Sequence, residues 1–430
     1  MAGPYVGTRD FYPEDMRFRS RMFGVLRRVC ESYGYEEYSA PLLEPLSLYQ
    51  SKSSEEIVGE QVYRFVDRGE REVAIRPEMT PTLARMVAAR AMQLVRPMRW
   101  YSIENFMRYE RPGKGRLREF YQLNADLMGS VTPAADAEIL TLLCDLLSGF
   151  GATEKDFTIK ISDRRIFDSF VVHPDKEVKR AIGRLLDKRE KIGDAAFTEE
   201  LAKVADAKLQ ARVHDFLKIR IEDLSALGEK GEIEPATAAH LQETFALLGA
   251  QGKSAFFQFD PGIVRGFDYY TGLIFEAVDN HPDNRRAICG GGRYDKLLGL
   301  FGKQDIAAVG FGLGDVTLEE FIRVRGLLPN AGEKSGCYWI LFPETCAQSL
   351  SIASVLRSKG LLVETSLEGG KIGKQFETAD KKGRRFALLQ GSEEVAKKIV
   401  RVKDLASAAQ TDVPEKELAD FLLAASLGAQ

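Results

Sequence analysis

The fold of this 430-residue chain is decided by residues 99–129, which have the sequence RWYSIENFMRYERPGKGRLREFYQLNADLMG. At the centre of this stretch, residues 112–115 contain two glycines and one proline, a composition that favours a chain reversal over continued helix or strand. Aromatic and aliphatic side chains flank the reversal on both sides. The stretch therefore predicts one long antiparallel hairpin.

The second strand of this hairpin has two different faces, because successive side chains of a strand point to opposite sides. One face is apolar and belongs to a core; it holds Leu117, Tyr121, Leu123, Ala125 and Leu127. The opposite face holds Arg118, Phe120, Gln122, Asn124 and Asp126. On the first strand, the same parity groups Phe106, Arg108 and Glu110. Such a regular polar row indicates either the floor of a polar site or the solvated side of a two-faced sheet.

Length and charge limit the class of protein. A chain of 430 residues is long enough for two or three domains with separate cores. The 60 Lys+Arg and 63 Asp+Glu residues give a formal charge of -3, so any nucleic-acid contact must come from local basic patches. An acidic balance of this size does not exclude an RNA-binding protein.

The cysteines and histidines show no metal-binding spacing. The five cysteines are scattered without a CxxC pair, at Cys30, Cys144, Cys289, Cys337 and Cys346. None of the four histidines pairs with a cysteine at zinc-ligand spacing, so we expect reduced, mostly buried thiols and no structural zinc site. The N-terminal residues lack an apolar signal core, and no later run approaches the length of a membrane span. These features predict a cytosolic protein.

Helical periodicity and cap residues predict three helices around the hairpin, over residues 14–33, 81–91 and 133–150. Thr80 stands before Pro81 and is expected to cap the second of these helices. Strand-like segments occupy residues 35–49, 63–67, 72–75 and 157–162. From residue 168 to 252 the sequence is helical, highly charged and poor in aromatics, which predicts an inserted helical subdomain with a small core.

Strand signals return in residues 254–278, SAFFQFDPGIVRGFDYYTGLIFEAV. Residues 290–295, GGGRYD, lack the GxGxxG spacing of a dinucleotide site and predict a tight glycine turn. Residues 310–314, GFGLG, precede a helix that we expect over residues 316–324.

The C-terminal quarter of the chain has a different rhythm. Residues 326–336, GLLPNAGEKSG, have the composition of an interdomain linker. Beyond them, short strands alternate with helices, which predicts a small α/β domain with a mostly parallel sheet. Basic side chains concentrate there at Lys371, Lys374, Lys381, Lys382, Arg384 and Arg385. This cluster indicates either a solvated helix face or an RNA contact.

Several of these stretches resemble one family. Residues 106–126, FMRYERPGKGRLREFYQLNAD, resemble motif 2 of class II aminoacyl-tRNA synthetases and, in detail, the histidyl-tRNA synthetases. Residues 265–272, RGFDYYTG, resemble the signature peculiar to the histidyl-tRNA synthetases and are the most specific match. Residues 35–49 resemble motif 1, and residues 310–314 resemble motif 3. Most class II synthetases carry an arginine where this chain has Thr317, so either another group holds the triphosphate of ATP or the ATP site is looser than in relatives with the arginine.

The resemblance covers almost the whole chain and implies its fold class. An α+β class II synthetase catalytic core, which is an antiparallel sheet flanked by helices, is expected over residues 1–325, interrupted by the helical insertion at 168–252. A linker at 326–336 then leads to an α/β anticodon-binding domain at 337–430. Motif 1 builds the dimer interface in this family, so a homodimer is expected.

The implied reaction is that of a histidine–tRNA ligase. L-Histidine attacks ATP to give histidyl-adenylate and diphosphate, and histidine then passes to the 3′ end of tRNA(His). Mg²⁺ is expected to accompany ATP, bound largely through phosphates and water and not by a protein metal site. The alternatives are a catalytically idle paralogue, such as the regulatory subunit of ATP phosphoribosyltransferase, and a pure RNA-binding or sensor module.

The resemblance also implies roles for single residues. In-line transfer between two anions requires arginines, so Arg108 and Arg265 are the expected catalytic residues. The expected histidine-binding residues are Glu78, Thr80, Arg108, Gln122, Asp126, Arg265, Tyr269, Tyr270 and Tyr294. The expected ATP-binding residues are Arg108, Arg116, Phe120 and Arg265. Asp126 stands where many bacterial members of the family have glutamate, and Glu78 is expected to take the α-ammonium group.

Overall fold

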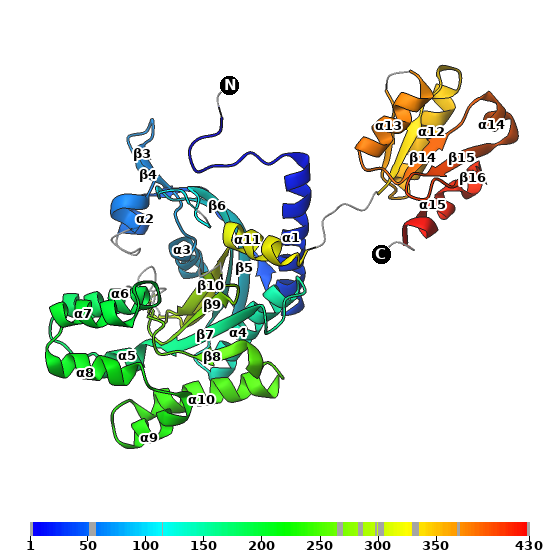
Figure 1. Cartoon of the computed structure of the whole chain (residues 1–430). Coiled ribbons are helices and arrows are strands. Elements are labelled where there is room, and N and C mark those ends of the chain that lie inside the picture. The colour runs from blue at the N-terminus through cyan, green and yellow to red at the C-terminus, as the bar shows by residue number, and fades with distance from the viewer. Residues whose placement is uncertain are drawn as a thin grey trace. The chain divides into compact units, whose positions relative to one another are not determined.

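The computed structural model describes residues 3–50, 57–113, 115–264, 270–282, 287–296, 299, 305–328, 335–367 and 370–427 (Figure 1). The chain divides into two compact units, Met1–Leu328 and Pro329–Gln430. The stretch predicted as a linker, 326–336, spans this division, and its residues 329–334 lie outside the described part of the chain. No helix among the described residues is both long enough and apolar enough to cross a membrane.

An eight-stranded sheet forms the centre of the first unit (Figure 1). In spatial order its strands are β1 (Glu36–Glu37), β5 (Met98–Met107), β6 (Glu119–Met128), β11 (Ala308–Gly314), β10 (Ala287–Arg293), β9 (Leu273–Asp279), β7 (Phe157–Asp163) and β8 (Phe257–Phe259). Neighbouring strands from β5 to β7 run antiparallel. The edge strands β1 and β8 run parallel to their neighbours. The antiparallel sheet that we predicted is confirmed in its centre, and the two parallel edges make it a mixed sheet.

The predicted hairpin is formed by β5 and β6, which pair along their whole length of ten residues. A bridge between Gly113 and Arg116 lies at the reversal. The face of β6 predicted to be apolar is buried at Leu123, Ala125 and Leu127. Because alternation determines which side chains reach the core, the opposite face of the same strand is left to the polar residues.

Three helices pack on the apolar side of the sheet: α1 (Pro13–Ser32), α4 (Pro133–Ser148) and α11 (Asp315–Arg325). Helix α4 contacts β6 and β11, α11 contacts β6 and β10, and α1 packs against α4. Each helix lies within a few residues of its predicted position. Thr132 begins α4 as expected, because its side chain accepts a hydrogen bond of 3.3 Å from the backbone N–H of Ala135.

A smaller three-stranded sheet and a helix cover the polar end of the hairpin. The sheet has the order β2 (Leu43–Pro45), β4 (Glu72–Ile75), β3 (Arg64–Val66), and short helical segments at Ser47–Gln50 (α2) and Ile57–Gln61 accompany it. Helix α3 (Thr80–Arg90) follows. The expectation that Thr80 caps α3 is wrong, because Met79 occupies the N-cap position and no side chain caps the helix. Thr80 is instead the first helical residue, and its hydroxyl remains available to the site described below.

The chain between β7 and β8 is helical. Its elements are α5 (Arg164–Phe170), α6 (Lys176–Ile192), α7 (Asp194–Val204), α8 (Ala207–Phe216), η2 (Ile221–Asp223), α9 (Leu224–Glu229), α10 (Pro235–Ala250) and η3 (Ser254–Phe256). The stretch predicted as an insertion, 168–252, begins inside α5 and ends just after α10. Buried residues of these helices, such as Leu201 and Phe216, belong to the same hydrophobic cluster as the central sheet. The helical segment is therefore packed as part of the first unit.

The second unit is an α/β fold with its own core. Its sheet has the order β13 (Val363–Thr365), β12 (Cys337–Ile340), β14 (Phe386–Leu389), β15 (Ile399–Asp404), β16 (Gln410–Pro414). Its helices are α12 (Cys346–Ser358), α13 (Ile372–Lys381), α14 (Ser392–Lys397) and α15 (Leu418–Leu427), with η5 (Pro343–Thr345) and η6 (Glu415–Glu417) between them. Only the β12 pairings are parallel, since β14, β15 and β16 run antiparallel. The prediction of a mostly parallel sheet is wrong because the connection from β14 to β15, residues 390–398, is too short for a parallel crossover of about a dozen residues, and because the mostly exposed β16 has no apolar alternation to reveal it.

The five cysteines are all free thiols, as predicted. Four are buried, and Cys346 is half-buried. Burial raises the pKa of Cys30, Cys144 and Cys337 to about 12, so these thiols stay protonated and unreactive at neutral pH.

Candidate active site

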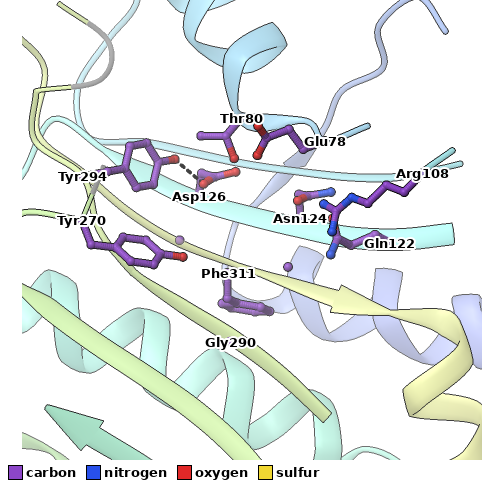
Figure 2. A pocket seen from close by; sticks show the side chains of 12 residues that line it. Glu78, Thr80, Arg108, Gln122, Asn124, Asp126, Tyr270, Gly290, Tyr294 and Phe311 are labelled. Atoms are coloured by element: carbon purple, nitrogen blue, oxygen red, sulfur yellow. Dashed lines mark hydrogen bonds between the residues drawn. The ribbon is translucent and has the colours of Figure 1, made fainter. Parts of the chain in front are cut away.

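A pocket opens on the polar face of β6 (Figure 2). It is lined by Glu78, Thr80, Arg108, Gln122, Asn124, Asp126, Tyr270, Gly290, Tyr294, Gly310, Phe311 and Gly312. These residues come from the start of α3, from the hairpin, from the segment before β9 and from strands β10 and β11 with Tyr294 directly after β10, and these segments are far apart in sequence. Four members of the polar row, Arg108, Gln122, Asn124 and Asp126, thus line a cavity and do not form a solvated face.

Most of the residues expected to bind histidine meet in this pocket. Glu78, Thr80, Arg108, Gln122, Asp126, Tyr270 and Tyr294 all line it. Arg265 and Tyr269 lie outside the described residues, so the structure says nothing of their positions. Figure 2 places Asp126 and the two tyrosines at one end of the cavity and Arg108 with Gln122 at the other. Glu78 and Thr80 lie along one side between these ends.

Asp126 is the most unusual group in the pocket. Its side chain is buried, with 6% of its surface exposed, and its carboxylate accepts a hydrogen bond from the hydroxyl of Tyr294. Burial raises the pKa of Asp126 to about 7, although the hydrogen bond from Tyr294 acts in the opposite direction. A carboxyl group with this pKa can accept a hydrogen bond from a ligand N–H, and it ionises most readily when a ligand brings positive charge.

Glycines on β10 and β11 make room for the floor residues. A Cβ atom on Gly310 would lie 2.1 Å from Oδ1 of Asp126, and one on Gly312 would lie 2.6 Å from Nε2 of Gln122. The prediction of a tight turn at residues 290–295 is wrong, because Gly290, Gly291 and Gly292 belong to β10. A Cβ atom on Gly291 would lie 2.3 Å from the carbonyl oxygen of Gly310. The glycines therefore allow close approach of strands and side chains, and they do not reverse the chain.

Two arginines fix the segment that carries Glu78. Arg76 is buried and donates to the carbonyl oxygens of Asn105 and Ala40 at 2.9 and 2.8 Å, while its Nη2 lies 2.6 Å from the carboxylate of Glu104. Arg108 donates from Nε to the carbonyl oxygen of Pro77 at 2.8 Å. Because one nitrogen of Arg108 is used in this way, its side chain is held in place with the rest of the guanidinium facing the cavity. Sequence reasoning did not assign this anchoring role to Arg76.

The residues expected to bind only ATP lie beyond the pocket. Phe120 stacks on Phe106 with ring centroids 5.8 Å apart, and the guanidinium of Arg108 lies 5.3 Å from the Phe120 ring centroid. Arg116 forms an ion pair of 2.7 Å with Glu110, and 60% of its side chain is exposed. Neither Phe120 nor Arg116 lines the cavity. Seven of the nine residues expected to bind histidine thus line the pocket, and these two ATP candidates lie outside it.

Thr317 has a local structural role. Its hydroxyl lies 2.8 Å from the carbonyl oxygen of Ile288 and 3.1 Å from that of Gly314, so it joins the first turn of α11 to β10. Asp315 in the same turn accepts the backbone N–H of Tyr121 at 2.9 Å and pairs with Arg9 at 2.5 Å. A threonine engaged with carbonyl oxygens supplies no positive charge to a triphosphate.

The lining residues that sequence reasoning missed are Asn124, Gly290, Gly310, Phe311 and Gly312. Asn124 was in the predicted polar row, and its position between Gln122 and Asp126 was a sufficient signal. The glycines could have been recognised from the alternation in GFGLG, where every second position lacks a side chain on the face toward the cavity.

The basic cluster of the second unit is partly neutralised. Glu364 pairs with both Lys382 and Arg384, the latter at 2.9 Å. Lys381 pairs with Glu377 at 2.6 Å. These ion pairs reduce the positive charge available to a nucleic acid, so any RNA contact here depends on fewer cations than the sequence suggests.

Known proteins resemble the chain along nearly its whole length. Residues 7–317 match the family model described as histidyl-tRNA synthetase, and residues 343–425 match the model described as anticodon binding domain. A histidine–tRNA ligase from Leptospira biflexa is 44% identical over 414 residues, which cover 94% of this chain and 94% of the relative. One from Opitutus terrae is 41% identical over 96% of both proteins. The crystal structure of histidyl-tRNA synthetase from Nostoc sp. PCC 7120 aligns with a TM-score of 0.83 at 26% identity and covers 98% of both chains.

Proposed function

Because this chain belongs to the histidyl-tRNA synthetase family, a family of aminoacyl-tRNA ligases, we propose that the pocket on β6 binds L-histidine and is the place where it reacts with ATP. The reaction is that of a histidine–tRNA ligase: histidine and ATP give histidyl-adenylate and diphosphate, and the histidyl group then passes to the 3′ end of tRNA(His). The observation that carries the site assignment is the order of chemical groups along the pocket, with a carboxyl and two phenols at one end and a guanidinium at the other.

The end with Asp126 fits the imidazole ring. Asp126 accepts the ring N–H, while Tyr270 and Tyr294 limit the shape of the ligand and supply hydroxyl groups. A buried carboxyl that requires an N–H partner rejects analogues without that group by a large factor, on the order of ten thousandfold for well-built sites. The side with Glu78 and Thr80 fits the α-ammonium group, and Gln122 fits a polar contact near the same carbon.

The end with Arg108 fits the reacting anions. A guanidinium can hold carboxylate and phosphate oxygens together and so orient the carboxylate toward the α-phosphorus. We assign Arg265 the same task on the basis of its place in the RGFDYYTG signature. Phe120 and Arg116 are proposed to contact ATP from the hairpin beyond the pocket. Thr317 carries no positive charge, so we do not assign it a role in holding the triphosphate.

Mg²⁺ is proposed to arrive with ATP. The described part of the chain contains no group of three or more His, Cys, Asp or Glu side chains placed to hold a metal ion. We propose an ion that is ligated mainly by phosphate oxygens and water, as Mg²⁺ commonly is. Its chemistry would be the neutralisation of charge on the leaving diphosphate.

We also propose a homodimer and a cytosolic location. Exposed apolar side chains lie along both edge strands of the small sheet, at Leu42 and Leu43 within the segment that resembles motif 1 and at Phe65 and Val66 in β3. A second copy of the chain would cover such a surface.

The free cysteines support a reducing compartment. The second unit is proposed to bind the anticodon arm of the tRNA.

Exchange of diphosphate into ATP, dependent on histidine, tests the proposed activity with the full chain. We expect exchange with L-histidine and not with other amino acids, and charging of tRNA(His) in the presence of ATP. An idle paralogue would bind histidine without exchange, and an RNA-binding module would do neither.

Replacement of Arg265 by alanine should reduce the exchange rate by at least a hundredfold, because it removes a preorganised donor.

A further inference from the structure

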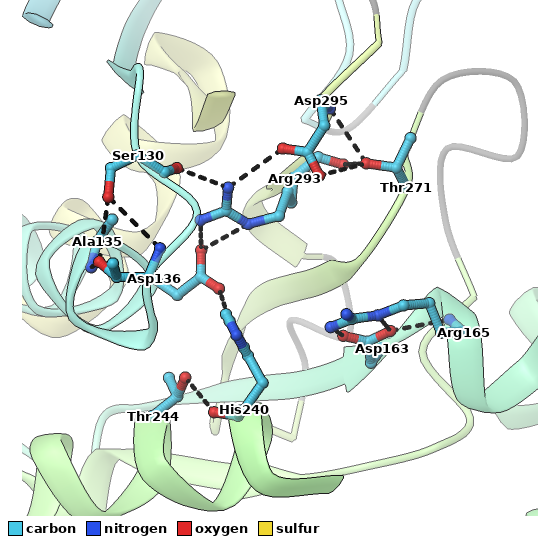
Figure 3. Close-up of polar contacts among 11 residues, drawn as sticks. Ser130, Ala135, Asp136, Asp163, Arg165, His240, Thr244, Thr271, Arg293 and Asp295 are labelled. Carbon is cyan, nitrogen blue, oxygen red and sulfur yellow. Dashed lines mark hydrogen bonds and ion pairs between the residues drawn. The ribbon is translucent and has the colours of Figure 1, made fainter. Parts of the chain in front are cut away.

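A buried polar cluster contains Arg293, Asp295 and Thr271, the chain neighbours of the pocket residues Tyr294 and Tyr270 (Figure 3). Its centre is Arg293, the last residue of β10, which has 4% of its surface exposed. The guanidinium donates to Oδ1 of Asp136 from Nε at 3.1 Å and from Nη2 at 2.5 Å, and Nη1 donates to the carbonyl oxygen of Ser130 at 2.9 Å. Asp136 lies in the first turn of α4 and is fully buried.

The second oxygen of Asp136 is held by the helical segment between β7 and β8. Nε2 of His240 in α10 lies 2.6 Å from Oδ2 of Asp136. Since a carboxylate can only accept, Nε2 of His240 carries the hydrogen. One buried carboxylate thus joins a strand of the catalytic sheet to α10, with Arg293 on one oxygen and His240 on the other.

The cluster continues to both tyrosines of the pocket. Asp295 receives Nη1 of Arg293 on one oxygen at 3.2 Å and the hydroxyl of Thr271 on the other at 3.1 Å. The backbone N–H of Thr271 donates to the carbonyl oxygen of Arg293 at 2.8 Å. Tyr294 stands between Arg293 and Asp295, and Tyr270 immediately precedes Thr271. The cluster therefore fixes the backbone on both sides of Tyr294 and on one side of Tyr270.

We propose that His240 is a positioning residue for histidine recognition, which acts through Asp136 and Arg293 on the two pocket tyrosines. This inference rests on the proposed function of the pocket. The path is short: His240 orients the carboxylate of Asp136, this carboxylate orients Arg293, and Arg293 sets the backbone from which Tyr294 reaches Asp126. A hydrogen bond from Tyr294 to Asp126 requires placement within a few tenths of an ångström, so a small shift of the end of β10 would weaken imidazole binding.

The buried hydrogen bonds of the cluster transmit a change at His240 to the backbone beside Tyr294. Removal of one partner from a buried hydrogen-bonded charge pair leaves the other partner unsatisfied, and the surrounding groups move to compensate. Arg293 can compensate only by turning toward Ser130 or Asp295, which are its other acceptors in the described structure. Either movement displaces the residues beside Tyr294. The helical segment is thus energetically linked to the histidine end of the pocket and not to the end with Arg108.

Replacement of His240 tests this inference in the full-length protein. His240→Leu removes the donor, and His240→Gln keeps an N–H group near the same place. We expect His240→Leu to raise the dissociation constant of L-histidine, measured by calorimetry, and its KM in exchange by about tenfold. The KM for ATP should stay within twofold of the parent, and His240→Gln should recover most of the histidine affinity.

Two further variants make the test decisive. His214 lies in α8 of the same helical segment, 6.2 Å from the ring centroid of Phe197, and has no place in the cluster. His214→Leu should leave histidine affinity unchanged. Thr271→Val removes the hydroxyl that donates to Asp295, at the other end of the cluster from His240, and should raise the dissociation constant of histidine about threefold. This variant tests the inference even if His240→Leu fails to fold.

The outcomes separate the two proposals. Unchanged histidine affinity in His240→Leu and Thr271→Val, or an equal loss in His214→Leu, would overturn the positioning role. An equal rise of the KM values for ATP and histidine would also overturn it, because a general disturbance of the fold explains that result. A parent protein that neither binds histidine nor catalyses exchange would refute the proposed function itself.

Discussion

Two buried aspartates, Asp126 on the pocket floor and Asp136 in the first turn of α4, have different partners in this fold. Asp136 has Arg293 on one oxygen and His240 on the other, so its charge is compensated within the protein. Asp126 is buried almost as deeply, yet the described residues give it the neutral hydroxyl of Tyr294 and an open side toward the cavity. Burial without a counter-charge raises its pKa to about 7.

The difference distinguishes a carboxylate that is paired within the protein from one that we propose is kept for a ligand. In a buried charge that is paired, interactions with its partners offset the free-energy cost of desolvation. In an unpaired one, that cost is offset only when a ligand binds. Among the described residues, Asp126 has no charged partner such as Arg293 provides for Asp136, and the imidazole N–H of a bound ligand would provide part of one. Polar burial alone therefore does not identify a binding residue; incomplete pairing beside a cavity does.

The largest effect that would sharpen this comparison is expected from Asp136→Ala. The variant leaves the guanidinium of Arg293 buried without its main partner, so the free energy of unfolding of the first unit should fall by about 3–5 kcal/mol. Of the two tryptophans, Trp100 lies in β5 and Trp339 in β12. Urea unfolding followed by the fluorescence of Trp100 in a Trp339→Phe background measures the first unit alone. Asp126→Asn in the same background should not lower stability at pH 8, and an equal loss in both variants would break the distinction.

A second test uses the pH dependence of stability without ligand. The pKa of Asp126 is about 7 in the folded protein against an ordinary value of 3.8, so folding favours the protonated form. The corresponding stability is present below pH 3.8 and is lost as pH rises through 7, in total roughly 4 kcal/mol at 1.36 kcal/mol per pKa unit. Compared with Asp126→Asn, the parent should therefore lose stability between pH 5 and pH 8. A difference between the two proteins that stays constant over this range would contradict the raised pKa.

A third expectation concerns ligand binding. Asp126→Asn presents an amide that can keep only part of the contact with the imidazole and loses the charge, so kcat/KM for histidine in exchange should fall by about a hundredfold, or roughly 3 kcal/mol. The KM for ATP should change little, because Arg108 lies at the other end of the pocket. A matched change, Asp295→Asn, lies in the paired cluster and should have a much smaller effect on kcat/KM. If both variants lose the same activity, pairing does not distinguish the two kinds of carboxylate.

The smallest effect is expected from Tyr294→Phe. This variant removes the hydroxyl that donates to Asp126 but keeps the aromatic ring, and one hydrogen bond to a charged group contributes about 1.5–3 kcal/mol. Since histidine can compensate by its own N–H, we expect a rise of about fivefold to tenfold in the KM for histidine. The pKa of Asp126 should rise further, because the hydrogen bond now lowers it. Stronger histidine binding in Tyr294→Phe would show that the hydroxyl competes with the ligand.

The sequence predicted the hairpin and its polar face because alternation is a local property. Gln122 and Asp126 could be placed on one face from parity alone, and the resemblance added Glu78 and Thr80 from another element. The contact of His240 with Asp136 could not be predicted, since no local pattern marks two residues that meet only after the chain has folded. Arg265 remains an expectation from resemblance.

The errors have a similar physical origin. Glycine in a short stretch favours a turn, but Gly291 is required because a neighbouring backbone passes too close for any side chain. Thr80 stands where a helix cap was expected. Helix α3 instead begins at Thr80, with Met79 at the N-cap position, and the threonine lines the pocket. β16 carries mostly exposed residues and pairs through its backbone, which leaves no hydrophobic signal. In each case tertiary packing, and not local preference, decided the outcome.

The shared core of the helical segment and the central sheet has a consequence for modularity. Phe167, Phe170 and Phe216 pack against one another within the same hydrophobic cluster as the strands of the sheet. A shortened chain that bridges residues 172–252 would expose the phenylalanines of α5 and would be expected to aggregate. In calorimetry, the segment and the sheet should melt as one cooperative block, with the second unit free to melt separately. What is an insertion in chain order is thus not a detachable part of the enzyme.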